Sequence, residues 1–126
     1  MKDDKSSKQA EKKNTVDLCS LCGFCKAGCP TFAATKSEAF SPRGRAILLK
    51  KGVIDKDIFN KCTLCGACEE RCPAKVGLGL REAREKLVES GRETAANKLM
   101  IENVRKFGNP FGKIEKGKIP DKLYCC

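Results

Sequence analysis

One pattern of cysteines occurs twice in this sequence, and it constrains the fold more than any other feature. CSLCGFCKAGCP covers residues 19–30 and CTLCGACEERCP covers residues 62–73, so both runs have the form C-x-x-C-x-x-C-x-x-x-C-P. The whole chain has 126 residues, of which 10 are cysteine and only 6% are aromatic. The hydrophobic core is therefore expected to be thin, and small chains of this kind often rely on a covalent or metal staple.

Metal ligation, rather than disulfide bonding, is the predicted role of these cysteines. The N-terminal stretch MKDDKSSKQAEKKNT is charged and lacks the apolar segment of a secretory signal peptide. The longest unbroken apolar run, residues 46–49, is far too short to span a membrane. We therefore expect a cytoplasmic protein, in which cysteines stay reduced and clusters of them are typical of metal sites. The chain has no histidine, so the side-chain ligands would be thiolates alone.

The spacing within each run is typical of four-iron clusters. Two-residue gaps let a loop wind around a compact cluster and point three thiolates at it. The fourth cysteine lies one residue further on, and the proline then turns the chain away. In two-cluster ferredoxins, the fourth cysteine of such a run is a ligand of the other cluster. We therefore predict two [4Fe–4S] clusters, with the first held by Cys19, Cys22, Cys25 and Cys72 and the second by Cys62, Cys65, Cys68 and Cys29.

Zinc is the main alternative to iron and sulfur at these cysteines. Zinc sites with four cysteines usually use two C-x-x-C pairs separated by a dozen or more residues, which fits this duplicated spacing poorly. Gly23 and Gly66 occupy the same place in each run, where the missing Cβ permits a close approach to a cluster. We favour iron–sulfur clusters and expect the apoprotein to be poorly folded, because metal binding then supplies much of the folding free energy.

The segments outside the cysteine runs predict an all-α fold. In SPRGRAILLKKG, Ser41 is expected as the helix N-cap, Pro42 at the first helical position and Gly52 just after the last turn. IDKDIFNKC is typical of a short helix that is capped by Asp55 and leads to the second run. No segment alternates between apolar and polar residues as a half-buried strand does.

Two further helices are expected after the second run. LGLREAREKLVESG and ETAANKLMIENVRKFG each place apolar residues on one helical face, and the glycines at their ends, Gly91 and Gly108, are expected to stop them. The expected apolar faces are Leu80, Ala83, Leu87 and Val88 in the first helix and Ala96, Leu99, Met100, Val104 and Phe107 in the second.

Beyond the cysteine runs, the sequence resembles one group of iron–sulfur proteins. SPRGRAILLK, CPAKVGLGLREAREKLVESG and ENVRKFGNPFGK look like the dicluster domain of heterodisulfide reductase subunits, which has relatives in glycolate, lactate and anaerobic glycerol-3-phosphate oxidation. The resemblance covers about residues 16 to 126 and implies the α-helical ferredoxin fold. It also implies a role in anaerobic metabolism: the passage of single electrons between a redox partner and a separate catalytic site.

The predicted domain organisation follows from these segments. We expect a disordered charged tail at residues 1–15, a dicluster domain at 16–107 and a linker at 108–126. In many relatives a cysteine-rich domain comes next, and the chain ends at KIPDKLYCC, close to where that domain would begin. Cys125 and Cys126 are therefore interpreted as the first residues of a lost or separately encoded domain; the alternative is a genuine tail that carries two thiols.

The partners implied by the resemblance are redox proteins: a cysteine-rich catalytic subunit, a flavoprotein or a cytochrome. No nucleotide-binding glycine motif, nucleophile–base pair or carboxylate dyad is present, so we expect no catalytic residues in this chain. The role is then that of an electron-transfer component. Membrane attachment would come only through a partner.

The positive charge is interpreted as a basic surface that docks an acidic protein. The formal net charge is +10, and two oxidised clusters with their thiolates would lower it by about 4, to roughly +6. No aromatic platform or groove-reading motif accompanies the lysines, so nucleic acid is not an expected partner. Arg43 and Arg45 are candidates for orienting a cluster or a partner, although exposed arginines in a first helical turn are more often only solvated.

Two alternative functions remain open at this point. The first is a metal-stapled structural or regulatory module that binds protein or nucleic acid and has no redox role. The second is disulfide exchange at Cys125 and Cys126, which is weak because adjacent cysteines form a strained ring when bridged.

Overall fold

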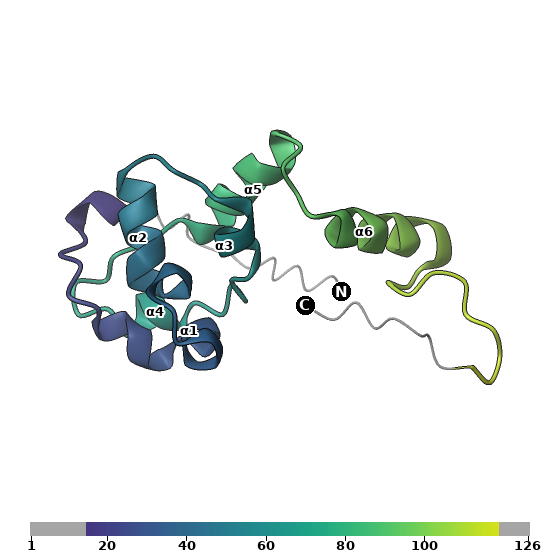
Figure 1. Cartoon of the computed structure of the whole chain (residues 1–126), viewed down its shortest axis with the longest axis horizontal. Helices are drawn as coiled ribbons and strands as arrows, with labels where there is room; N and C mark the ends of the chain where they lie inside the picture. Colours follow the sequence, from purple (N-terminus) through teal and green to yellow (C-terminus); the bar gives the residue numbers. More distant parts are fainter. Residues whose placement is uncertain (1–14, 119–126) are drawn as a thin grey trace, which may run out of the picture.

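The computed structural model describes residues 15–118, and this range contains helices but no strands (Figure 1). The all-α prediction is therefore confirmed for the described residues. The short 3-10 helices are η1 (Val16–Leu18), η2 (Phe24–Gly28) and η3 (Glu38–Phe40). The α-helices are α1 (Pro30–Thr35), α2 (Pro42–Lys50), α3 (Lys56–Asn60), α4 (Ala67–Glu70), α5 (Leu80–Glu89) and α6 (Ala95–Phe107).

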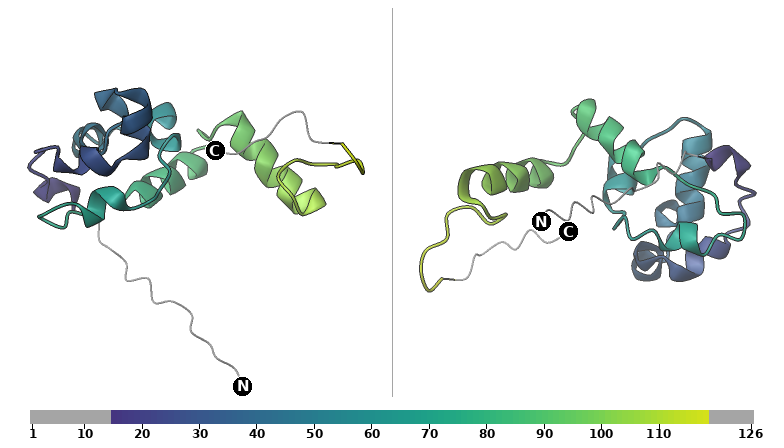
Figure 2. Two further views of the ribbon diagram at one scale, coloured as in Figure 1. Left: turned by 90° about the horizontal axis from the view of Figure 1, so that it is seen from below. Right: turned by 180° about the vertical axis from the view of Figure 1, so that it is seen from behind.

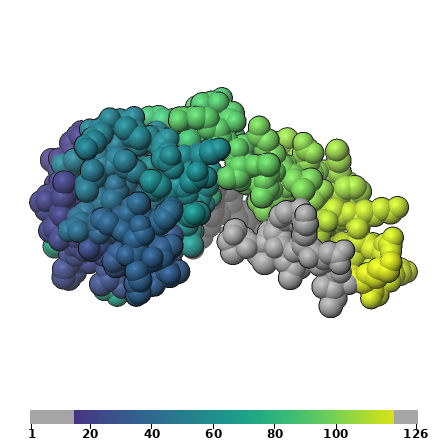
Figure 3. Space-filling model, viewed as in Figure 1, coloured from purple at the N-terminus to yellow at the C-terminus, as the bar shows by residue number. Residues whose placement is uncertain are grey.

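The helices form one main body and one outlying arm. α1 to α4 gather at one end of the molecule, α5 leads away from them, and α6 lies to the side (Figures 1 and 2). The space-filling view shows the same division into a rounded body and an arm that contains α6 (Figure 3). No helix in the described range is both long and apolar enough to cross a membrane.

Local signals set the start of α2 as the sequence predicts. The Ser41 hydroxyl accepts a hydrogen bond from Gly44 N at 2.9 Å, and Pro42 occupies the first turn. A side-chain cap of this kind satisfies one of the N–H groups that have no partner within the helix. Gly44 permits η3 to lie directly against this turn, because a Cβ there would overlap the carbonyl oxygen of Glu38.

The predicted cap of α3 is also confirmed, since the Asp55 carboxylate accepts from Asp57 N at 2.9 Å and from Ile58 N at 3.0 Å. This short helix contributes Phe59, which is fully buried, to the core. The buried residues that form one cluster with it come from η1, α2, α4, the segment after the second cysteine run, and α5: Val16, Ala46, Cys68, Val76, Leu78, Leu80, Ala83 and Leu87.

The apolar face predicted for α5 is confirmed except at its edge. Leu80, Ala83 and Leu87 are buried, whereas Val88, which was expected on the same face, is 47% exposed. Arg84 fixes the orientation of α5, because its guanidinium donates to Cys62 O at 2.9 Å and to Asn60 O at 3.0 Å. This places α5 directly behind the start of the second cysteine run.

The α6 helix ends at the glycine that the sequence predicts but has no buried face. Thr94 caps its start by accepting from Asn97 N, and Gly108 ends it in a left-handed conformation with a φ of 72°. Leu99, Val104 and Phe107 of its expected apolar face are exposed. Cys125 and Cys126 lie outside the described residues.

Candidate metal centres

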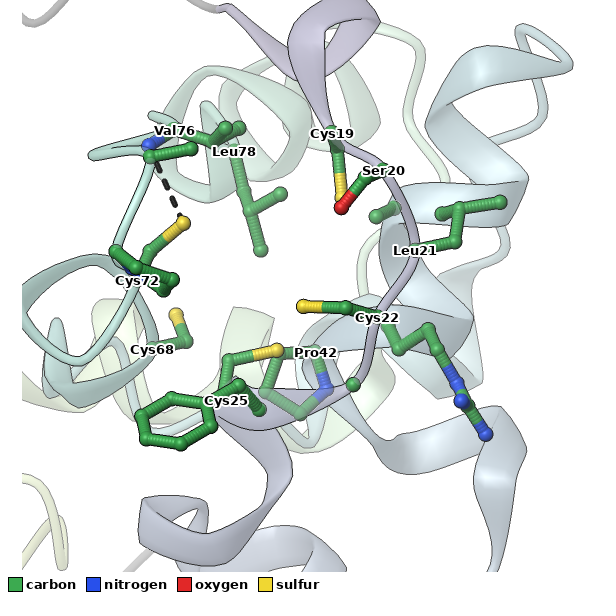
Figure 4. Close-up of a pocket in the computed structure, with 16 residues that line it drawn as sticks. Cys19, Ser20, Leu21, Cys22, Cys25, Pro42, Cys68, Cys72, Val76 and Leu78 are labelled. Atoms are coloured by element: carbon green, nitrogen blue, oxygen red, sulfur yellow. Dashed lines mark hydrogen bonds between the residues drawn. The ribbon is translucent and has the colours of Figure 1, made fainter.

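One pocket in the described part of the chain brings cysteines of the two runs together (Figure 4). Three come from the first run and two from the second, and their sulfur atoms face a common space: Cys19, Cys22, Cys25, Cys68 and Cys72. All of these except Cys68 belong to the first predicted ligand set. Cys29, the last cysteine of the first run, does not line this pocket.

Hydrogen bonds far from the sulfur atoms explain how Cys72 reaches the first run. Thr15 N donates to Gly77 O at 2.9 Å, and Gly77 N donates to the Thr15 hydroxyl at 2.9 Å. The chain that enters the first run is thus joined to the chain that leaves the second. Val76 N then donates to Cys72 Sγ at 3.5 Å, which holds the thiol toward the pocket (Figure 4).

Apolar side chains form much of the remaining wall. Ala46, Val76 and Leu78 all line the pocket and are at most 5% exposed. Lys50 holds the start of the first loop onto α2, because its ammonium donates to Cys19 O at 2.7 Å and to Asp17 O at 3.2 Å. Walls of this kind exclude water and strengthen the electrostatic interactions of any group inside.

The two cysteine loops repeat the same backbone conformation. Leu21 and Gly23 have φ values of 60° and 80°, and Leu64 and Gly66 have values of 55° and 74°. A leucine in the left-handed region is uncommon and costs energy, so such residues concentrate at functional sites. The sequence predicts the glycines of this turn but gives no signal for the leucines.

The second cysteine of each run, Cys22 or Cys65, is exposed, and its surroundings favour the thiolate form. The pKa of Cys22 is lowered chiefly by the N–H of Phe24, and the Ser20 hydroxyl contributes further. The pKa of Cys65 is lowered in the same way by the N–H of Ala67 and by the Thr63 hydroxyl. Because the thiolate is the form that binds metal, both loops prepare this position for ligation.

The third cysteine of each loop is less accessible and behaves in the opposite way. Burial raises the pKa of Cys25, and the nearby thiols of Cys19, Cys22 and Cys72 raise it further. Burial, followed by Glu69, Cys62 and Cys25, raises the pKa of Cys68 to about 12. Closely spaced, desolvated thiols of this kind become thiolates only when a bound cation compensates their charge.

The second predicted set is brought together less completely than the first. Cys62 and Cys68 interact, while Cys65 is exposed on its loop. The Thr31 hydroxyl donates to Lys61 O at 3.2 Å, so the chain just after Cys29 lies against the chain just before Cys62. Cys29 itself is buried and accepts from Phe32 N at 3.4 Å.

Cys68 lies between the two sets. It is predicted as a ligand of the second cluster, yet it also lines the first pocket, and Figure 4 shows its sulfur near Cys25 and Cys72. Cys25 and Cys68, the third cysteines of the two runs, therefore line the same pocket. The two candidate centres are therefore neighbours within one body.

A group of charged residues borders the first loop, and it includes one of the two arginines singled out from the sequence. Arg43 lines the pocket, and its Nε donates to Glu38 Oε1 at 2.6 Å. The same carboxylate receives Lys26 Nζ at 3.0 Å and the Ser41 hydroxyl at 3.1 Å. Arg43, with Lys26 and Ser41, lowers the pKa of Glu38 to about 2, so this carboxylate stays charged at neutral pH.

Arg45, the second of these arginines, has a different position from the one expected. Instead of being solvated it is 1% exposed, and its Nε and Nη2 both donate to Ile58 O at 3.3 Å. It joins α2 to α3 within the body. The expectation of an exposed side chain is wrong because the acceptor lies thirteen residues away in sequence and becomes a neighbour only in the fold.

The donor groups of these sites fit an iron–sulfur cluster better than a single ion. Within residues 15–118, no three potential ligand side chains lie close enough to hold one metal ion. The sulfurs of the first predicted ligand set, with that of Cys68 beside them, instead surround a shared space, which suits a group that offers a separate iron to each thiolate (Figure 4). Asn60 Nδ2, just before the second run, is buried and has no hydrogen-bond partner in the described structure.

A comparison with protein families supports the same interpretation. Residues 15–76 match the family described as 4Fe-4S dicluster domain, a range that includes every cysteine of both runs. The match begins at Thr15, the residue that exchanges two hydrogen bonds with Gly77. No curated protein sequence matches the chain significantly.

Proposed function

We propose that this 4Fe-4S ferredoxin-type domain, residues 15–76 of the chain, relays single electrons through two [4Fe–4S] clusters. In the proposal, Cys19, Cys22, Cys25 and Cys72 hold the first cluster. Cys62, Cys65, Cys68 and Cys29 hold the second. The observation that carries the proposal is the position of Cys72, which lies among the cysteines of the first run although 46 residues separate it from Cys25.

The residues around each centre stabilise the charge of the thiolates, and an apolar wall borders the first centre. When bound, a [4Fe–4S] cluster accepts and returns one electron at a time. The backbone N–H groups and hydroxyls around Cys22 and Cys65 disperse the negative charge of the thiolates. The buried side chains of Ala46, Val76 and Leu78 form an apolar wall on one side of the first set.

The shared position of Cys25 and Cys68 supports transfer between the two centres. In the proposed assignment these cysteines belong to different clusters, yet both line the same pocket. The two centres would then lie close together. Such an arrangement suits a relay that takes an electron at one centre and releases it from the other.

The wider context of the proposal is an Fe–S oxidoreductase complex of the heterodisulfide reductase type, located in the cytoplasm. The chain would contribute no catalytic residues, and its partners would be a cysteine-rich catalytic subunit, a flavoprotein or a cytochrome. The sequence resemblance supports this context, as do the formal charge of +10 and the exposed apolar side chains of α6, which are available for contact with another protein.

Strictly anaerobic purification tests the proposed function. We expect a brown protein with about eight irons and a matching amount of acid-labile sulfide per chain, corresponding to two four-iron clusters. Reduction with dithionite should produce EPR signals of reduced clusters, and oxidation should remove them. A protein that contains zinc, lacks acid-labile sulfide and shows no reversible reduction would contradict the proposal.

A further inference from the structure

The duplication of the cysteine loop provides an internal comparison between the two centres. Both loops have the same pattern of left-handed residues, and both supply an N–H and a hydroxyl to the middle cysteine. The local backbone conformation and its hydrogen bonds are therefore the same at the two centres. A difference between them has to come from side chains that reach one loop and not the other.

Arg43 is such a side chain. A Cβ built on Gly23 of the first loop would lie 2.9 Å from Arg43 Nη1, so the guanidinium lies directly against this glycine. A Cβ built on Gly66, the equivalent glycine of the second loop, would meet no described atom within 4 Å. Arg43 also lines the first pocket and interacts with Cys22 and Cys25.

The position of Arg43 is fixed by the helix that carries it and by an ion pair with Glu38. It lies in the first turn of α2, which Ser41 caps, and its Nε is held by Glu38 at 2.6 Å. Glu38 is in turn held by Lys26 and Ser41. The group of Arg43, Lys26 and Glu38 has a net charge of +1 from two cations and one anion, and its guanidinium faces the cysteine loop.

We propose that Arg43 sets the order in which the two centres are reduced, by making the first centre the easier one to reduce. This inference rests on the proposed function. Reduction adds one electron, taken from a one-electron donor, and the added negative charge is stabilised by a nearby fixed cation. The second loop lacks an equivalent cation against its glycine, and Glu69 lies beside Cys68. A single electron that enters the domain therefore reduces the first centre rather than the second at equilibrium.

A redox titration followed by EPR on the loaded protein tests this role with two substitutions of opposite effect. Arg43→Gln removes the cation. We expect the equilibrium constant for reduction to fall about tenfold at the centre with the more positive reduction potential, which lowers that potential by about 59 mV for a one-electron couple. Glu38→Gln removes the anion next to Arg43 but keeps an amide oxygen as acceptor. It should raise the same potential. The more negative potential should stay unchanged in both variants.

Two controls separate the charge from other effects of substitution. Arg43→Lys keeps the positive charge and should keep the order of reduction. Arg105→Gln removes an exposed arginine on α6, which lies away from the cysteine loops (Figure 1). It should leave both potentials as they are in the unaltered protein.

Each outcome of the titration decides the question. The inference is overturned if the unaltered centres share one potential, if Arg43→Gln shifts both equally or neither, or if it shifts the more negative one. If Arg43→Gln loses iron, the upward shift expected in Glu38→Gln becomes the deciding result, and an unchanged potential rejects the inference. A protein that never contains iron and sulfide rejects the proposed function as well, whereas normal loading with unshifted potentials rejects only the role of Arg43.

Discussion

Thr15 and Gly77 exchange two hydrogen bonds, one in each direction and both 2.9 Å long. The pair joins two points that are 62 residues apart in sequence, one just before the first cysteine run and one just after the second. Everything between them, including all eight cysteines of the runs, is enclosed in one loop of chain. The joint explains why a cysteine from the end of the second run can lie beside the beginning of the first.

Removing the Thr15 hydroxyl should loosen this joint. In Thr15→Val the side-chain shape is kept, but Gly77 N loses its acceptor in a partly buried position. We expect a loss of about 1–3 kcal/mol in the free energy of unfolding of the loaded protein, measured by anaerobic chemical denaturation. Thr15→Ser retains the hydroxyl and serves as the control. Equal losses in the two variants would show that the hydrogen bond is not the cause.

Replacing Cys72 should mainly affect the centre formed by the other run. Cys72 lies with Cys19, Cys22 and Cys25 in one pocket, so Cys72→Ser is expected to alter the EPR signal and the iron content of that centre. Cys29→Ser is the reciprocal variant and should alter the other signal. If both substitutions changed the same signal, or if each affected the cluster of its own run, the exchange of ligands would be wrong.

The equivalent glycines of the two loops should differ in their tolerance of a side chain. Gly23 and Gly66 both have positive φ, so alanine at either position costs about 1–2 kcal/mol of backbone strain. Only at Gly23 would the new Cβ also press against Arg43. We therefore expect Gly23→Ala to be the more destabilising change and to shift the more positive reduction potential. Equal effects in denaturation and in redox titration would argue against the close contact.

Removing a helix cap should lower the free energy of unfolding of the body only when the capped helix is part of the body. Ser41 caps α2 and is fully buried, so Ser41→Ala should lower the free energy of unfolding by about 1–2 kcal/mol. Thr94 caps α6, which buries no residue against the body, so Thr94→Ala should reduce helicity locally without changing the unfolding of the body. Circular dichroism and denaturation of the loaded protein distinguish the two results.

The features that the sequence predicted best are those that depend on neighbouring residues. Ser41 and Asp55 cap their helices because the groups they bind are two or three positions away. Gly108 ends α6 because its backbone adopts the left-handed conformation directly after the last turn. The spacing of the cysteines likewise predicts a dicluster domain, and the family comparison agrees with it.

The features that the sequence did not predict depend on contacts between distant segments. Val88 and Leu87 are adjacent on α5, and only the placement of the body decides which of them is covered. Arg45 is buried because the Ile58 carbonyl meets it, and the Thr15–Gly77 joint has no local signature at either end. The left-handed leucines, Leu21 and Leu64, are imposed by the shape of the cysteine loops rather than by any preference of leucine.

The enclosure of both runs within the Thr15–Gly77 joint has a consequence for biosynthesis. With the proposed ligands, the first run alone offers only three thiolates to its cluster during translation, and the fourth emerges from the ribosome with Cys72. Neither centre can then be completed on a nascent chain before the second run is made. Completion of either cluster would then require the second run to have been made and brought against the first.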